Sequence, residues 1–311
     1  MSSIIKKHLP KTGAIYGILL FLVVFSAINP RFFSINNFFN ITRQTAVLSI
    51  LTICAFLAIL THQLDLSIGG VCSLTGMVAA ALLRDGNSLI ISFVAALSVG
   101  VAIGLVNGLL AGFTTIPPFV ITLATMNISS SLGLLIFSGT IQVRNARLSW
   151  LSNGNIGIIP FPLILIFIIY IIFWFILTKR KYGICLYAVG GKSDAAQASG
   201  INVRLVKISV YLINGALSSL AGMMMISRLS AANPSSALGY ELDAICAAVL
   251  GGTSLVGGKG KIGGAFLGAL AISILRNGMN VVGLRLVSQK MVIGAVLIVI
   301  LLIDVFRKEG K

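Results

Sequence analysis

Long runs without a charged side chain constrain this sequence more than any other feature. The seventeen residues from Phe161 to Leu177 contain none, and a helix of about 20 such residues crosses the hydrocarbon core of a bilayer. Charged residues make up only 10% of the chain, against about 25% in soluble domains, so a water-soluble enzyme is excluded. A transmembrane β-barrel is disfavoured because its strands alternate polar and apolar residues. The sequence therefore predicts an all-α polytopic membrane protein.

About ten of these runs are long enough to be transmembrane helices. The first follows three lysines and resembles a signal peptide, but no small-residue cleavage site follows it, so we interpret it as an uncleaved signal anchor. The predicted spans are Gly13–Ile28, Ala46–Leu60, Leu66–Leu83, Leu89–Phe113, Phe119–Phe137, Phe161–Leu177, Ile208–Ile226, Leu242–Val256, Ile262–Val282 and Val287–Val305.

The distribution of lysine and arginine predicts the orientation of these spans. With the N-terminus inside, cytoplasmic segments carry fourteen basic residues and outer segments eight, which is the bias of cytoplasmic loops. The net charge of +16 therefore reflects membrane orientation rather than nucleic-acid binding. We expect both termini in the cytoplasm, with a tail over 1–12, one transmembrane domain over 13–305 and a second tail over 306–311.

The predicted cytoplasmic loop over 179–207 is long and rich in glycine and charge. Ser193 can cap a short helix, Asp194 suits its first turn, and Gly200 can end it. These signals predict a six-residue helix outside the bilayer, on which another protein can dock. A solvated connector is the alternative interpretation.

A faint internal repeat is present. Leu64-Asp65 follows the second span and Leu242-Asp243 the seventh, while Asn107-Gly108 and Asn277-Gly278 close the fourth and ninth. A shift of five spans reverses the membrane orientation, as in inverted-repeat transporters. Two dipeptide pairs also arise by chance, so the repeat stays a hypothesis.

The chain has no recognisable ATP site or hydrolytic centre. Gly258-x-Gly260-x-x-Gly263 matches a dinucleotide fingerprint only as a string, because no βαβ unit surrounds it. We interpret it as a tight cytoplasmic turn. His8 and His62 lack partners at metal or triad spacing, and the four cysteines form no C-x-x-C pair. We therefore expect no catalytic residue and no metal.

Few polar residues fall within the spans, and they are the candidates for contact with a solute. Asp65 and Asp243 are the only acidic residues near enough to the membrane core to form an ion site, although either can instead bind exposed N–H groups at a helix N-terminus. Four asparagines can meet hydroxyl groups or bridge helices: Asn107, Asn127, Asn214 and Asn277. Glycines spaced four apart, from Gly100 to Gly108, predict close helix packing.

Several stretches resemble one known family. They are Asn29-Pro30-Arg31-Phe32-Phe33, Leu64-Asp65-Leu66-Ser67-Ile68-Gly69, Tyr187-Ala188-Val189-Gly190-Gly191, Ala195-Ala196, Ser199-Gly200-Ile201-Asn202-Val203, Gly239-Tyr240-Glu241-Leu242-Asp243-Ala244-Ile245 and Gly257-Gly258-Lys259-Gly260. Together they resemble the permease subunits of ribose-type ABC sugar importers, from about Asn29 to the C-terminus.

This resemblance implies a type II ABC importer-like permease that moves a monosaccharide, ribose first, into the cytoplasm by alternating access. It implies a separate cytoplasmic ATPase subunit that binds ATP and magnesium, a second permease copy and an external sugar-binding protein. This chain would then bind no cofactor itself. The expected location is the bacterial cytoplasmic (inner) membrane.

The resemblance also assigns residues. Asp194-Ala195-Ala196-x-x-x-Gly200 resembles the coupling motif of ABC permeases, whose usual first residue is Glu. We expect contact with the ATPase at Gly191, Ser193, Asp194, Ala195, Ala196, Ser199 and Gly200. We place the solute path at Asp65 and the four asparagines, and give Glu241 and Asp243 a structural or gating role.

Two other classes of transporter stay open. A proton-coupled secondary transporter would work alone, and a passive channel would not accumulate its solute. The scarcity of embedded carboxylates weighs against the first, and the predicted helix after Ser193 weighs against the second.

Overall fold

The computed structural model describes residues 13–309, with side chains described through Val299 and at Leu302. The predicted tail over 1–12 therefore lies outside the described residues. The helices, in chain order, are α2 (Gly13–Ile28), η1 (Pro30–Phe33), α3 (Ile35–Leu60), α4 (Ser67–Arg84), α5 (Leu89–Phe113), α6 (Pro118–Ile136), α7 (Ala146–Asn153), α8 (Phe161–Lys179), α9 (Lys181–Gly191), α10 (Ser193–Ala198), α11 (Val203–Leu229), α12 (Tyr240–Leu250), α13 (Ile262–Val281) and α14 (Leu286–Glu309).

Seven of the described helices are long and apolar enough to cross a membrane: α3, α4, α5, α6, α8, α11 and α13. The helix α2 and the stretch Leu286–Val299 of α14 are shorter apolar helices. The prediction of a helical, multi-pass membrane protein is thus confirmed. The last helix continues to Glu309, past the predicted end of the last span at Val305.

One predicted span does not form a helix long enough to cross the bilayer by itself. Leu242–Val256 was expected to cross the bilayer, but α12 ends at Leu250 and has 11 residues, about 16 Å of helix. That length covers roughly half of a hydrocarbon core about 30 Å thick. Gly252 directly follows the helix cap and has φ +89°, which ends the helix. Gly257 has φ +85° and turns the loop that follows.

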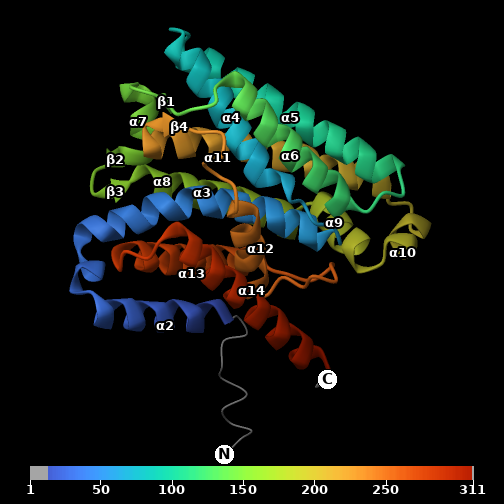
Figure 1. Cartoon of the computed structure of the whole chain (residues 1–311). Helices are drawn as coiled ribbons and strands as arrows, with labels where there is room; N and C mark the ends of the chain where they lie inside the picture. Colours follow the sequence, from blue (N-terminus) through green and yellow to red (C-terminus); the bar gives the residue numbers. More distant parts are fainter. Residues whose placement is uncertain (1–12, 310–311) are drawn as a thin grey trace, which may run out of the picture.

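The helices form layers around α3, whose most apolar stretch is 89% buried (Figure 1). On one side lie α4, α5, α6 and α11, and on the other lie α13 and the N-terminal helix α2, far apart in sequence but in contact. The predicted close packing is confirmed between α5 and α11. A Cβ on Gly104 would lie 2.3 Å from the carbonyl oxygen of Tyr211, so the two backbones touch.

The two ends of the layered helices differ in structure (Figure 1). At one end α7 lies beside two small antiparallel pairs, β1 (Ile141–Gln142) with β4 (Ala231–Ala232), and β2 (Asn155–Ile156) with β3 (Ile159–Pro160). The short helices α9 and α10 lie at the opposite end.

Candidate functional site

The segment predicted to couple to an ATPase forms a short helix. It is α10, which has six residues as predicted and is followed by Gly200 with φ +83°. Backbone N–H groups of Gly200 and Ile201 bind carbonyls in the helix in the Schellman pattern of a helix end. The predicted cap is wrong, because Ser193 is the first helical residue, Lys192 precedes it, and no side chain caps the helix.

A single side chain anchors α10. Ala196 is 4% exposed and belongs to the main apolar core. The other residues expected to couple are exposed: Gly191, Ser193, Asp194, Ala195, Ser199 and Gly200. The helix is therefore a projecting knob whose outer surface is free within the described chain.

Backbone contacts join α9 to the end of α3 and to the loop after α12. The N–H of Gly258 donates to the carbonyl oxygen of Leu60 at 2.9 Å. A Cβ on Gly190 would lie 1.7 Å from that same oxygen, and one on Gly257 would lie 2.6 Å from the carbonyl oxygen of Gly190. No side chain fits at these positions. We call Gly190, Gly257 and Gly258 the glycine seam.

The string that matches a nucleotide motif therefore serves backbone packing. The N–H of Ser254 donates to the carbonyl of Lys259 at 2.9 Å, and Gly258 has φ +64°, which confirms the predicted tight turn. Because this loop follows directly from α12, the glycine seam links α10 at the surface to α12 inside the helix layers.

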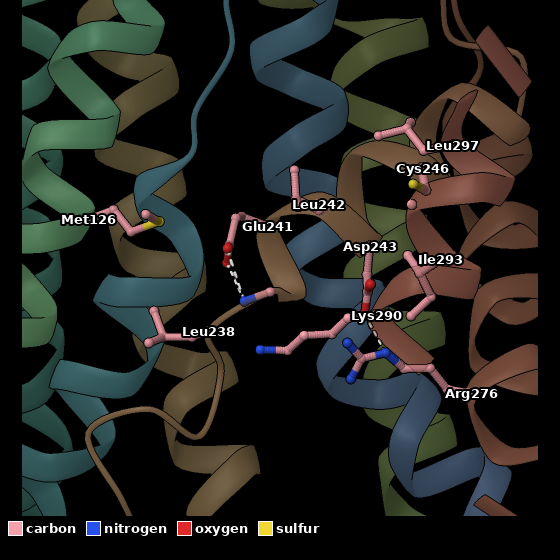
Figure 2. A pocket seen from close by; sticks show the side chains of 12 residues that line it. Met126, Leu238, Glu241, Leu242, Asp243, Cys246, Arg276, Lys290, Ile293 and Leu297 are labelled. Carbon is pink, nitrogen blue, oxygen red and sulfur yellow. Dashed lines mark hydrogen bonds and ion pairs between the residues drawn. The ribbon is translucent and has the colours of Figure 1, made fainter. Parts of the chain in front are cut away.

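A cavity of about 330 Å³ lies at the start of α12, and we call it the α12 cavity (Figure 2). A turn over 233–239 leads into it and ends at Gly239, whose φ is +96°. Both carboxylate oxygens of Glu241 accept from the N–H of Gly239, at 2.9 and 3.0 Å. Gly69 of α4 leaves space for this carboxylate, since a Cβ there would lie 2.1 Å from it. Glu241 thus holds the turn that opens α12.

A buried ion pair forms one wall of this cavity. Asp243 contacts Nε of Arg276, and their side chains are 1% and 20% exposed. The guanidinium carbon lies 4.4 Å from the ring centroid of Tyr240, whose hydroxyl accepts from Arg228 at 3.4 Å. Ionisable groups at membrane depth are costly and mark solute or ion pathways.

A second cavity, of about 550 Å³, adjoins the α12 cavity at Arg276, which lines both. Most of its lining is amide or basic, so we call it the amide cavity. It includes Asn40, Arg43, Gln44, Asn153, Arg228, Tyr240, Asn280 and Gln289. Since Asn153 ends α7, this cavity lies toward the α7 end of the molecule.

Three of the five predicted path residues meet in one buried cluster. Asp65 accepts from the N–H and hydroxyl of Ser67 at 3.0 and 2.6 Å, and from Asn214 at 2.9 Å. Asn107 donates to the Ser67 hydroxyl at 3.0 Å. Because Ser67 begins α4, Asp65 binds a helix N-terminus, the structural alternative raised above. The space among these side chains is too small for a water molecule.

The other two predicted path residues lie elsewhere. The amide oxygen of Asn277 accepts from Asn37 at 2.8 Å and ties α13 to α3. Asn127 is exposed on α6, next to Met126, which lines the α12 cavity. The structure therefore does not gather the predicted path at one cavity, and its buried members bridge helices.

The predicted site omitted most of the residues that line the two cavities, among them Tyr240, Arg276 and Lys290. A signal for Arg276 was present, because an arginine within an apolar span is a functional hypothesis by itself. Lys290 carried a weaker form of the same signal, because it is the fourth residue of the predicted span Val287–Val305, and Tyr240 carried none. They reach the cavities only because α12, α13 and α14 pack together.

Comparison with known proteins gives consistent matches over nearly the whole chain. The family model described as "Branched-chain amino acid transport system / permease component" matches residues 37–301. Ribose import permease protein RbsC of Escherichia coli (strain K12) is 38% identical over 96% of this chain and 95% of that protein. Ribose import permease protein RbsC of Bacillus subtilis (strain 168) is 36% identical over 96% and 94%.

A permease named for a different sugar is also similar. D-allose transport system permease protein AlsC of Escherichia coli (strain K12) is 33% identical over 94% of this chain and 91% of that protein. No solved structure matches the chain.

Proposed function

This chain belongs to the ribose-type permease family of ABC importers, and from that membership we propose that it carries ribose inward across the bacterial cytoplasmic membrane. It is a transport subunit of a monosaccharide importer and not an enzyme. Ribose is favoured as the transported sugar because the chain is 36–38% identical, over nearly its full length, to ribose permeases of two bacteria. Its identity to the D-allose permease is 33%.

The family works with an ATPase subunit and a substrate-binding protein. We expect ATP and magnesium to bind to the ATPase subunit, and a second permease copy to complete the pathway. The knob formed by α10 is the element best suited to receive the ATPase, because it projects at one end and exposes Asp194.

The proposed orientation places the α9–α10 end in the cytoplasm. Basic residues are concentrated there, at Lys179, Arg180, Lys181, Lys192, Arg204, Lys207, Lys259 and Lys261, as the positive-inside rule requires. The amide cavity then faces outward. The turn over 233–239 and the short helix α12 together make one crossing, so ten crossings with both termini inside are compatible with the shorter α12.

The glycine seam gives this orientation a mechanical consequence. Movement of α10 during ATPase closure acts on Gly190, which lies against Gly257 and Gly258 in the loop from α12. Since α12 carries Glu241 and Asp243 at its other end, the same movement reaches the α12 cavity. Alternating access then needs only two positions of α12, each favoured by one nucleotide state of the ATPase.

The test is purification of the tagged chain from membranes that contain the whole importer. Asp194→Lys is expected to lose the ATPase subunit and ribose uptake while inserting normally. Asp85→Lys is the matched control. Asp85 is an exposed carboxylate that directly follows α4, at the end of the molecule away from α10 (Figure 1), so this variant should retain the ATPase. A chain that moves ribose into liposomes alone, without ATP, would overturn the importer proposal.

A further inference from the structure

Four charged side chains from three helices face the α12 cavity. Glu241 and Asp243 come from α12, Arg276 from α13 and Lys290 from α14. Figure 2 shows Lys290 extending across the cavity toward the side where Leu238 and Glu241 lie, with the Arg276 guanidinium beside Asp243. The formal charges cancel, so the cavity offers polar groups without a net charge.

These side chains keep unused hydrogen-bonding capacity. Glu241 is committed to Gly239, and Asp243 to Nε of Arg276. Among the described residues, the terminal guanidinium nitrogens of Arg276 and the ammonium of Lys290 have no hydrogen-bond or ion-pair partner. Arg276 is only 20% exposed, so unpaired donors on its guanidinium are costly at membrane depth. Lys290 is exposed and lines the same cavity, and a ligand with acceptor oxygens would bind both groups.

Most of the remaining lining is apolar and lies on several sides of the cavity (Figure 2). It comprises Met126, Leu238, Leu242, Ile293 and Leu297. A sugar ring has hydroxyl groups on its edge, each both donor and acceptor, and C–H groups on its faces. Binding cavities commonly combine an apolar lining with a few placed polar groups, and this volume is within their usual range of about 300–1,000 Å³.

The charge balance discriminates among solutes. An ion would leave one charge uncompensated in a low-dielectric site, which costs free energy. A zwitterionic amino acid would need an unpaired cation and an unpaired carboxylate on the cavity wall. The cavity carboxylates, Glu241 and Asp243, are already bound to Gly239 and Arg276. Neutral hydroxyl groups can bind the remaining donors without breaking either contact.

We infer that the α12 cavity is the site where the neutral sugar is held during passage, with its hydroxyl groups bound by Arg276 and Lys290 and its ring against Leu242 and Ile293. This inference rests on the proposed function and extends it, because it locates the sugar in the permease itself. The cluster around Asp65 is then part of the scaffold.

Site-specific thiol labelling tests the location directly. Gly294 lines the cavity, and nothing lies within 4 Å of a Cβ built there, so Gly294→Cys should fold. Gly263→Cys is the matched control, also on an open helix surface but outside this cavity. Both are made with Cys185→Ser, since the other three cysteines are buried. The assembled importer with its binding protein and ATP is labelled with a maleimide, with ribose or leucine added.

Ribose is expected to slow labelling at Gly294→Cys severalfold and to leave Gly263→Cys unchanged. Lys290→Met should lower ribose uptake about tenfold, the loss expected for one charged hydrogen bond, while Arg285→Met, which removes a nearby charge outside the cavity, should not. If wild type imports ribose but ribose does not protect Gly294→Cys, the site is refuted and the function stands. Protection by leucine instead refutes the sugar site, and a wild type that does not import ribose refutes the proposed function.

Discussion

A single methyl group at the glycine seam should uncouple ATP hydrolysis from sugar movement. In Gly190→Ala the new Cβ would lie 1.7 Å from the carbonyl oxygen of Leu60 and 2.7 Å from the nitrogen of Gly258. These two atoms hydrogen-bond to each other at 2.9 Å. Both neighbours are backbone, so they cannot rotate away, and the seam must open by roughly 1 Å or more to reach ordinary contact.

The cost follows from two effects. Loss of a buried backbone hydrogen bond costs about 1–3 kcal/mol, and overpacking costs about 1–3 kcal/mol. Alanine recovers about 0.5–1 kcal/mol because it is the better helix former. The net cost of closing the seam is therefore about 1–5 kcal/mol, and a cost of about 2 kcal/mol lowers its closed population roughly 30-fold.

The assay compares ribose uptake with ATP hydrolysis in proteoliposomes that contain the assembled importer. The helix α10 keeps its own end structure in Gly190→Ala, so the ATPase should still bind and hydrolyse ATP. Uptake per ATP should fall about fivefold for a cost of about 1 kcal/mol and roughly 30-fold for a cost of about 2 kcal/mol. Loss of the ATPase from the complex would instead show that the seam only holds α10 in place.

The neighbouring glycine supplies the control. Nothing lies within 4 Å of a Cβ built on Gly191, so Gly191→Ala adds the same methyl group to the same helix end without a clash. Because Gly191 is also a predicted ATPase contact, the comparison is made on complexes that keep the ATPase, in which Gly191→Ala should import ribose with the uptake per ATP of wild type. The reasoning is refuted if Gly190→Ala imports ribose with unchanged stoichiometry, or if the two variants are equally impaired.

Two further predictions concern the scaffold. Gly104→Ala should lower the free energy of unfolding in detergent by about 1–3 kcal/mol, because its Cβ would press on the backbone of α11. Gly263→Ala is the control, because Gly263 lies on an open helix surface and the substitution should leave the free energy of unfolding unchanged. Heating followed by size-exclusion chromatography measures the stability of both variants. An equal loss of stability in both would refute the packing argument. Asp65→Ala should lower stability by about 1–3 kcal/mol by leaving buried donors unpaired, with uptake per folded molecule retained. Exposed Asp85→Ala is its control, and a stable Asp65→Ala that transports nothing would return Asp65 to the solute path.

The sequence predicted much of the fold because its signals are local. Hydropathy over windows of about 20 residues located the long helices. The helix α10 was predicted from Ser193, Asp194 and Gly200, although Ser193 lies inside the helix instead of capping it. The eighth span failed for a reason that is also local. The run Leu242–Val256 is apolar enough to suggest a crossing, but its glycines end the helix at Leu250.

The candidate site was less accessible to sequence reasoning. An asparagine in an apolar span has the same signature whether it faces a solute or another helix, and only packing showed that Asn107, Asn214 and Asn277 bridge helices. A buried aspartate has the same ambiguity, which the contact of Asp65 with the start of α4 resolved.

Composition, hydropathy and charge by themselves determined that this is a helical membrane protein and located most of its long apolar helices, but not η1, α7 or α9. The tertiary structure alone decided which backbones touch at Gly190 and Gly258, which carboxylate pairs with Arg276, and where cavities remain. The physical reason is separation along the chain. Hydropathy and helix termination depend on neighbours within a few turns, whereas Leu60, Gly190 and Gly258 meet only after the intervening helices have packed.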